Sequence, residues 1–344
     1  MDRTELSSIG EFALIDHLTS SFEQKQTSTI KAVGDDAAVL GEAEQKTLIS
    51  TDQLIEGIHF DLGYTPLKHL GYKAVAVNLS DILAMNAIPS QVLVSIAASN
   101  RFSLEALEEL YSGIKTCCEV YKVDLVGGDT SSSPAGLVIN VSAIGFQEEN
   151  KIVYRSGANE GDLICVSGDL GAAYLGLQLL NRERAVFQEN PEVQPELDGY
   201  DYVLERQLKP EPRFDVIRLL EEKGVQPTSM IDVSDGLSSE SMHLAKQSAL
   251  GVTIYEDKIP IDPASALASE ELKLDSLTCA LNGGEDYELL FTIPQSGYDK
   301  IKDEAELEVI GHMTEAGHFL VNNLGQQIEL KAQGWGAFAG ATQG

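Results

Sequence analysis

The chain has 344 residues, enough for two domains of ordinary size, and its 43% hydrophobic and 23% charged residues are typical of a globular protein. Its 54 acidic residues outnumber 24 basic ones, and the formal net charge of −30 disfavours a polyanionic partner such as DNA. The first twelve residues hold no apolar stretch of signal-peptide length, and no run approaches the roughly 18 apolar residues of a membrane span.

The first half of the chain alternates between helical and strand-like patterns. Apolar residues at helical spacing predict helices over 9–22, 65–87 and 103–121. The helix over 65–87 is nearly all apolar and should be buried, and Ser103 is placed to cap the helix over 103–121. Short or alternating apolar runs predict strands over 37–40, 46–50, 91–99, 123–126 and 136–146, the fourth of which enters a glycine turn. This alternation predicts a layered α/β domain.

A polar, glycine-bearing segment over 151–162 is expected to be a hinge between two units. We therefore predict an N-terminal α/β domain over 1–150 and a C-terminal α/β domain over 151–344. The second domain opens with a strand over 163–168 and a helix of small residues over 170–180. Residues 181–210 are acidic and punctuated by prolines, which predicts a surface insertion or loosely packed helices.

Six aspartates share a context of small or apolar neighbours near a turn: Asp35, Asp52, Asp81, Asp129, Asp232 and Asp235. One such residue would be interpreted as a turn residue or a helix cap. A buried, unpaired carboxylate is costly, however, and needs a cation or a proton. Basic residues are scarce near these motifs, so metal ions are the simplest partners. Asp81 shares a face of the apolar helix with Asn78, although it could instead cap that helix or turn outward.

Oxygen ligands favour a hard cation over zinc or an iron–sulfur cluster. The cysteines form no CxxC pair and are expected to be reduced, in a cytoplasmic protein: Cys117, Cys118, Cys165 and Cys279. The sequence "DVSDG" lacks the ligand spacing of a calcium-binding EF-hand loop. Mg²⁺ binds one or two carboxylates and fills its remaining positions with water and phosphate oxygens. The dispersed aspartates therefore predict several Mg²⁺ ions around a polyphosphate.

Two glycine pairs, at 127–128 and 283–284, would let backbone N–H groups approach a phosphate closely. The standard nucleotide-binding signatures are absent. The stretch "GEAEQKT" lacks the second glycine of a P-loop, and "GWGAFAG" misses the spacing of a dinucleotide-binding loop. A nucleotide site here would therefore be of another type.

Seven motifs, taken together and in order, resemble those of the thiamine-monophosphate kinase family. They are "VGDDAAVL", "STDQLIEGIHF", "AVNLSDILAM", "GGDT", "YRSGANEGDLICVSGDLGAA", "DVSDGL" and "GGEDYELLF". The resemblance covers residues 10–340 and lies within a superfamily of ATP enzymes similar to aminoimidazole-ribonucleotide synthetase. It implies a two-domain α/β fold whose N-terminal sheets pair across a homodimer. It also implies Mg²⁺-assisted transfer of phosphate from ATP to thiamine monophosphate, giving thiamine diphosphate.

The resemblance further implies roles for individual positions. The implied metal-site positions are Asp35, Ser50, Thr51, Asp52, Asp81, Asp129, Asp232 and Asp235. The implied ATP-contacting positions are Tyr111, Gly128, Asp129, Arg155 and Ser234. The implied contacts with thiamine monophosphate are His59, Glu285 and a C-terminal aromatic residue, either Trp335 or Phe338. The chain departs from the family pattern at Asn86, where glycine is usual, and in "SSES" after "DVSDGL", where a further acidic residue is usual.

Structural roles remain open for several of these residues. Arg155 could form a salt bridge in the hinge, Glu285 could cap a turn, and His59 and Tyr111 could be core residues. Two other functions also remain. Another enzyme of the superfamily is one, although a selenophosphate synthetase would need a reactive cysteine nearer the N-terminus than Cys117. A non-catalytic acidic protein that binds divalent metal is the other, although ion storage would not need the glycine pairs.

The implied reaction needs no catalytic protein base, because the acceptor phosphate is already an anion at neutral pH. Its barrier is the repulsion between two polyanions, which positioning and charge neutralisation reduce. In "VGDDAAVL" we expect Asp35 to be the metal ligand. We expect Asp36 to point elsewhere if the backbone is extended there.

Overall fold

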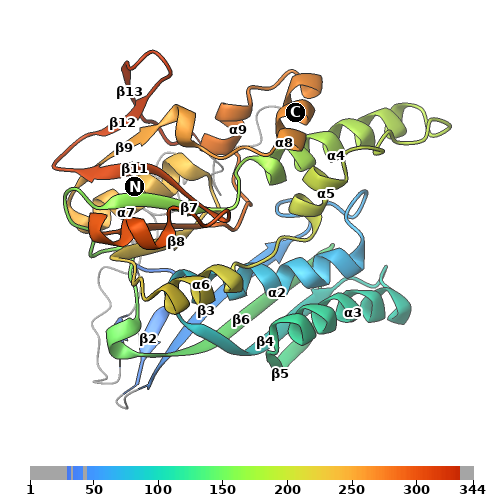
Figure 1. Cartoon of the computed structure of the whole chain (residues 1–344). Coiled ribbons are helices and arrows are strands. Elements are labelled where there is room, and N and C mark those ends of the chain that lie inside the picture. Colours follow the sequence, from blue (N-terminus) through green and yellow to red (C-terminus); the bar gives the residue numbers. More distant parts are fainter. Residues whose placement is uncertain (1–28, 32–33, 42–44, 334–344) are drawn as a thin grey trace, which may run out of the picture.

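The structure is a computed structural model that describes residues 29–31, 34–41 and 45–333. Two β-sheets organise this part of the chain, each with its own helices (Figure 1). The first sheet has the strand order β1-β2-β3-β6-β4-β5. Its strands are β1 (Thr29–Lys31), β2 (Ala38–Leu40), β3 (Gln45–Ile55), β4 (Ile88–Ala98), β5 (Asp124–Ser132) and β6 (Leu137–Glu148). The helix predicted over 9–22 lies outside the described residues.

Two helices follow the predicted segments closely and pack together beside the first sheet: α2 (Leu67–Ala84) and α3 (Leu104–Tyr121). Helix α2 lies on β3, β6 and β4 and is buried along most of its length, as its apolar composition predicts. Ser103 caps α3 by accepting a hydrogen bond from the Ala106 N–H at 3.3 Å. After α2, Asn86 adopts a left-handed φ of 58°, which asparagine tolerates and which accounts for its standing where glycine is usual.

The predicted glycine turn after residue 126 is wrong. Strand β5 instead continues through Gly127 and Gly128 to Ser132, parallel to β4. A Cβ atom at Gly128 would lie 1.8 Å from the carbonyl oxygen of Val94. The second glycine therefore allows β5 to approach β4 closely within the sheet.

The second sheet has the strand order β13-β12-β9-β11-β7-β10-β8. Its strands are β7 (Leu163–Ser167), β8 (Ser229–Asp232), β9 (Gly251–Tyr255), β10 (Leu289–Ile293), β11 (Leu307–Thr314), β12 (His318–Val321) and β13 (Gln327–Glu329). The helices after β7 are α4 (Ala172–Glu189), α5 (Asp201–Leu208), α6 (Phe214–Lys223), α7 (Leu237–Ser248), α8 (Pro263–Leu272), α9 (Ser276–Asn282) and α10 (Tyr298–Ile301). Short 3₁₀ turns lie at η2 (Glu149–Lys151), η3 (Glu256–Lys258) and η4 (Gln295–Gly297).

Residues 181–210 are only partly the surface insertion that their composition predicts. Helix α4 extends to Glu189, and α5 returns along it with Val203 and Gln207 buried (Figure 1). The last part of α4, from residue 184 onward, and the connection to α5 over 190–200 are largely exposed. The other prediction for this stretch, loosely packed helices, agrees better with α4 and α5, although the buried face of α5 consists of only a few residues within a charged stretch.

Helix α2 connects the two halves of the structure. Its residues Leu70, Val75 and Leu79 belong to the core of the first sheet. At its C-terminal end, Leu83 and Ala84 pack into a separate core with residues of β7, β10 and α6. Both sheets therefore fix the position and rotation of α2. No helix in the described part of the chain is long and apolar enough to span a membrane.

Candidate active site

A cleft of about 880 Å³ lies where the two sheets meet. It is lined by the end of β3 and the loop after it, one face of α2, one face of α4, the end of β8 and the loop before β10. The residues predicted from sequence that line it are Thr51, Asp52, His59, Asp81, Asp232, Ser234, Asp235 and Glu285. These residues span 235 positions of the sequence, so only the fold brings them together.

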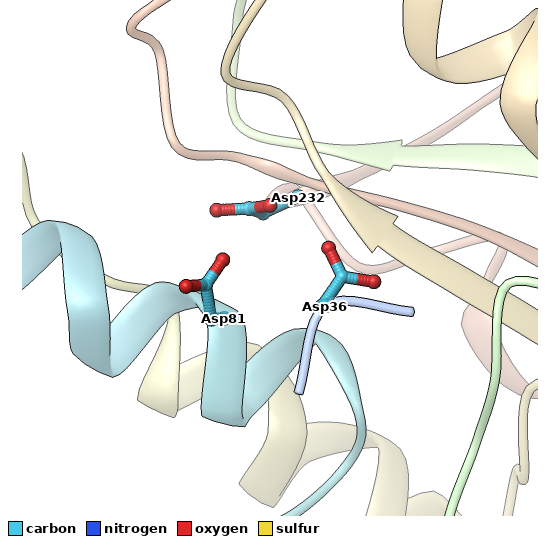
Figure 2. A group of neighbouring side chains, drawn as sticks. All are labelled: Asp36, Asp81 and Asp232. Atoms are coloured by element: carbon cyan, nitrogen blue, oxygen red, sulfur yellow. The ribbon is translucent and has the colours of Figure 1, made fainter. Parts of the chain in front are cut away.

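Three carboxylates converge at this cleft. Asp36, Asp81 and Asp232 each offer an oxygen atom within 4.8 Å of the others (Figure 2). Asp36 comes from the bend before β2, Asp81 from α2 and Asp232 from the end of β8. We call these three residues the carboxylate cluster. Its members come from both sheets and from the helix that connects them.

Burial makes this arrangement costly without a cation. Burial first, and then the charges of Asp52, Asp232 and Asp36, raise the pKa of Asp81 well above its usual value. Burial, followed by the Asp36 charge, also raises the pKa of Asp232. Two like charges about 4 Å apart repel by roughly 4 kcal/mol at an effective dielectric constant of 20. A divalent cation between the carboxylates would reverse that energy, and an all-oxygen ligand set suits Mg²⁺.

Hydroxyl groups orient two of these carboxylates. Ser50 on β3 donates a hydrogen bond to Asp81, and Ser80 on α2 donates one to Asp232 at 2.5 Å. Because a serine hydroxyl can support a carboxylate without adding charge, both bonds fix the geometry while leaving the cluster anionic.

Asp36, and not Asp35, belongs to the carboxylate cluster, whereas the sequence led us to expect Asp35 as the metal ligand. Asp35 instead lies 3.5 Å from the Lys31 ammonium and accepts hydrogen bonds from the backbone N–H groups of Asp36 and Arg155. The prediction assumed an extended backbone with alternating side chains. Residues 34–37 form a bend that begins at Gly34, with a φ of +110°, so the alternation does not apply.

Arg155 holds Asp36 through a two-pronged contact. Its Nε donates to one Asp36 oxygen at 2.8 Å and its Nη2 donates to the other at 2.7 Å. The contact joins the segment before β7 to the bend before β2, so the hinge salt bridge considered from sequence is present. The single positive charge of Arg155 compensates only part of the negative charge of the three carboxylates, so the cluster keeps an excess of negative charge.

The β3 residues have different orientations. The backbone N–H of Asp52 donates to the Asn78 side chain at 2.9 Å. Asn78 therefore fixes β3 against α2. Its helical spacing predicts that it extends into the site beside Asp81, but its side chain is used for this contact with β3 instead. The Thr51 hydroxyl turns toward β6, where it lies 3.0 Å from the Val141 carbonyl oxygen and 2.9 Å from the Ser142 hydroxyl.

Three predicted site residues in the described part of the chain neither line the cleft nor contact the carboxylate cluster: Tyr111, Gly128 and Asp129. In the first sheet, Asp129 is in register with Ser95 of β4, then Asn140 of β6, then Gln53 of β3. Three steps between strands separate β5 from β3 by about 14 Å. Tyr111 lines a different pocket, between α3 and the start of β5. A single chain therefore does not bring these residues to the carboxylate cluster.

The predicted substrate contacts His59 and Glu285 also line the cleft. Burial lowers the pKa of His59, whose Nδ1 accepts a hydrogen bond from the Ile55 N–H at 3.0 Å. Glu285 is held by Lys73 at 3.0 Å and by Gln207 at 2.9 Å. Trp335 and Phe338 lie outside the described residues.

Some residues of the cleft were not identified from sequence. Tyr174, Leu177, Asn181 and Arg184 form one face of α4 and line the cleft together. Their spacing of three and four residues is a helical signal, but it is equally typical of a core face. Arg184 pairs with Asp61 across the cleft at 2.8 Å, a contact that sequence spacing does not indicate.

Comparisons with known proteins place the chain among ATP-dependent enzymes. Residues 34–147 match the family described as AIR synthase related protein, N-terminal domain, and residues 159–321 match its C-terminal domain. The chain is 34% identical over 334 residues to a thiamine-monophosphate kinase of Aquifex aeolicus, covering 97% of this chain and 99% of the relative. It is 36% identical over 337 residues to one of Buchnera aphidicola subsp. Schizaphis graminum, covering 95% and 98%.

A solved structure, AaThiL complexed with AMPPCP and TMP, matches with a TM-score of 0.83 and 31% identity, covering 98% of this chain and 99% of that chain. The agreement in sequence and structure extends over both sheets. The two-domain α/β fold similar to aminoimidazole-ribonucleotide synthetase, expected from the sequence motifs, is confirmed.

The carboxylate cluster predicts a difference between two adjacent aspartates. Mg²⁺ should raise the unfolding temperature of the wild-type protein, because a ligand at about one hundred times its Kd stabilises the folded state by about 2.7 kcal/mol. Asp36→Asn should lose most of this rise, whereas Asp35→Asn should keep it. The measurement is thermal unfolding with and without Mg²⁺. An equal response of both variants would contradict the assignment of Asp36 to the cluster.

Proposed function

The chain belongs to the thiamine-monophosphate kinase family, and we propose that its carboxylate-lined cleft is where ATP phosphorylates thiamine monophosphate, with Mg²⁺ held by Asp36, Asp81 and Asp232. The enzyme is a phosphotransferase that makes thiamine diphosphate, with ATP as co-substrate. The observation that carries the site assignment is the convergence of three carboxylates, two of which, Asp81 and Asp232, line the cleft. Asp52, whose charge acts on both Asp81 and Asp232, is a further candidate ligand.

Bound Mg²⁺ would neutralise phosphate charge and so reduce the repulsion between ATP and the acceptor phosphate. The acceptor needs no protein base, because its phosphate oxygen is already anionic. The protein's own contribution is therefore to position the two substrates. Ser234 and Asp235 come two and three residues after the cluster residue Asp232 and line the cleft, so they are placed to contact the phosphates and a metal ion.

Arg155 is proposed to act on ATP while it remains paired with Asp36. Its guanidinium is largely buried, with 16% of the side chain exposed, and two of its nitrogens are engaged by Asp36. A guanidinium has further N–H groups that can reach a phosphate oxygen. The same residue can therefore form the hinge salt bridge and contact ATP.

A homodimer is proposed because one chain leaves part of the predicted site incomplete. Strand β5 is the edge of the first sheet, and every one of its residues is exposed, including Leu125 at 46% and Val126 at 56%. An exposed apolar edge strand favours association. Tyr111, Gly128 and Asp129 lie at this edge, about 14 Å of sheet away from Asp52. A second copy of the chain would bring its own β5 edge to the cluster of the first.

Two further parts of the proposal concern organisation and location. We divide the chain into domains over 1–150 and 151–344, a division supported by the change of sheet between β6 and β7. We also propose a cytoplasmic location. All the cysteines are buried and unpaired, which suits a reducing compartment.

The proposed activity is tested with purified protein, ATP, Mg²⁺ and thiamine monophosphate. The wild type should form thiamine diphosphate, and Asp81→Asn should reduce kcat about a hundredfold or more, because it removes a carboxylate proposed to hold the Mg²⁺ that neutralises the reacting phosphates. Asparagine keeps the size of the side chain and can still accept the Ser50 hydrogen bond. A wild-type protein that binds metal without forming product would support the non-catalytic metal-binding alternative.

The shared site of the proposed dimer is tested by mixing two inactive variants. Asp81→Asn and Asp129→Asn chains are co-expressed, so that mixed dimers form. If each site takes Asp81 from one chain and Asp129 from the other, mixed dimers regain one intact site, and the mixture should reach about one quarter of wild-type activity. Activity no higher than that of the separate variants would contradict a site shared between two chains.

A further inference from the structure

We propose that Lys73 is a positioning residue for substrate binding: it fixes the Glu285 carboxylate in the cleft so that thiamine monophosphate meets a preformed hydrogen-bond acceptor. The inference rests on the proposed function, which assigns Glu285 to the substrate. It goes beyond that assignment by naming a residue of the first domain that acts only through Glu285.

Lys73 is a buried cation on a helix that is mostly apolar. It lies in α2, is 4% exposed, and its ammonium is 3.0 Å from a Glu285 oxygen and 3.0 Å from the Gln207 carbonyl oxygen. A buried lysine is costly unless it is paired. Its position seven residues before Ser80 and eight before Asp81 places it on the helix that also supports the carboxylate cluster.

Glu285 is held from both sides. Lys73 contacts one carboxylate oxygen, and the Gln207 side chain donates to the other at 2.9 Å. The Glu285 side chain is still 29% exposed and lines the cleft. Since each carboxylate oxygen can accept more than one hydrogen bond, the fixed group keeps acceptor capacity for a ligand.

The backbone around Glu285 is anchored independently of Lys73. Glu285 and Tyr287 have left-handed φ values of 60° and 52°, and their N–H groups donate to the carbonyl oxygens of Ser234 and Val233 at 2.7 and 2.9 Å. Asp286 accepts hydrogen bonds from the backbone at the start of α4. Removing the Lys73 ammonium should therefore free the Glu285 side chain while leaving the loop in place.

The chemistry of the substrate fits such an acceptor. Thiamine monophosphate carries an amino group on its pyrimidine ring and a positive charge on its thiazolium ring, and both are attracted to a carboxylate. A carboxylate that is already fixed loses little conformational freedom when the substrate binds. Losing this order should weaken substrate binding in the ground state and transition state alike, which raises KM and leaves kcat unchanged.

The test is a double-mutant cycle on substrate KM. Lys73→Met keeps the length of the side chain and removes the ammonium, and should raise the KM for thiamine monophosphate about tenfold, the loss expected for one hydrogen bond to a charged group. The KM for ATP and kcat should change less than twofold. In a Glu285→Gln background, adding Lys73→Met should cause no further rise in KM, because Lys73 acts through Glu285.

Lys46→Met is the matched control. Lys46 is a second buried lysine, on β3 of the first sheet. It is 6% exposed and lies 3.2 Å from Glu149, and it does not line the cleft. It should leave the KM for thiamine monophosphate unchanged. If Lys73→Met does not fold, Gln207→Met tests the other support of Glu285 and should also raise that KM, with no further rise in a Glu285→Gln background.

The outcomes separate this inference from the proposed function. If the wild type phosphorylates thiamine monophosphate but Lys73→Met leaves its KM unchanged, or raises it equally with and without Glu285, the positioning role is wrong and the function stands. If the wild type forms no thiamine diphosphate, the function fails first. In that case the affinity for thiamine monophosphate is measured by calorimetry. If Lys73→Met binds it as tightly as the wild type does, the positioning role is wrong as well.

Discussion

Repulsion among buried carboxylates is the constraint around which this site is built. Asp36 and Asp232 are buried beside the partly buried Asp81, and the chain brings them together from a bend, a helix and a strand end. Their mutual repulsion would push these carboxylates apart, so the surrounding structure must hold them in place. The Ser50 and Ser80 hydroxyls and the Arg155 guanidinium do so, and a divalent cation would turn the remaining repulsion into attraction. The same negative charge that makes the cluster costly would attract a divalent cation, which in turn would bind a polyphosphate.

Helix α2 transmits this constraint to the rest of the molecule. It supplies Asp81 to the cluster, Ser80 to Asp232, Asn78 to the β3 backbone and Lys73 to Glu285. Its apolar side chains are buried in the cores of both sheets, so these polar groups are held in fixed directions. The residues proposed to bind metal and those proposed to bind substrate are thus attached to one rigid element. Phosphoryl transfer, which depends on positioning more than on covalent chemistry, gains from that rigidity.

Much of the fold and part of the site could be predicted from sequence, for physical reasons. The apolar run of α2 and the capped amphipathic α3 carry strong local signals, and Asp81 and Asp232 were identifiable because carboxylates are unusual in such apolar surroundings. The sequence favoured Asp35 as the metal ligand, whereas the structure brings Asp36 to the cluster, because side chains do not alternate between two faces in a bend. Lys73 was missed, because its partner lies 212 positions away in sequence. Asp129 has the sequence context of a metal ligand, but only the sheet order reveals that it lies several strands away from the cluster of its own chain.

The central claim is that Asp36, Asp81 and Asp232 bind a divalent cation together. The most direct measurement is the anomalous X-ray scattering of Mn²⁺ in crystals grown with an ATP analogue, since Mn²⁺ also prefers oxygen ligands. The account predicts an anomalous peak within about 2.5 Å of oxygen atoms from at least two of the three carboxylates. Crystals of active protein with Mn²⁺ bound to the ATP analogue, but with no peak at these carboxylates, would contradict it.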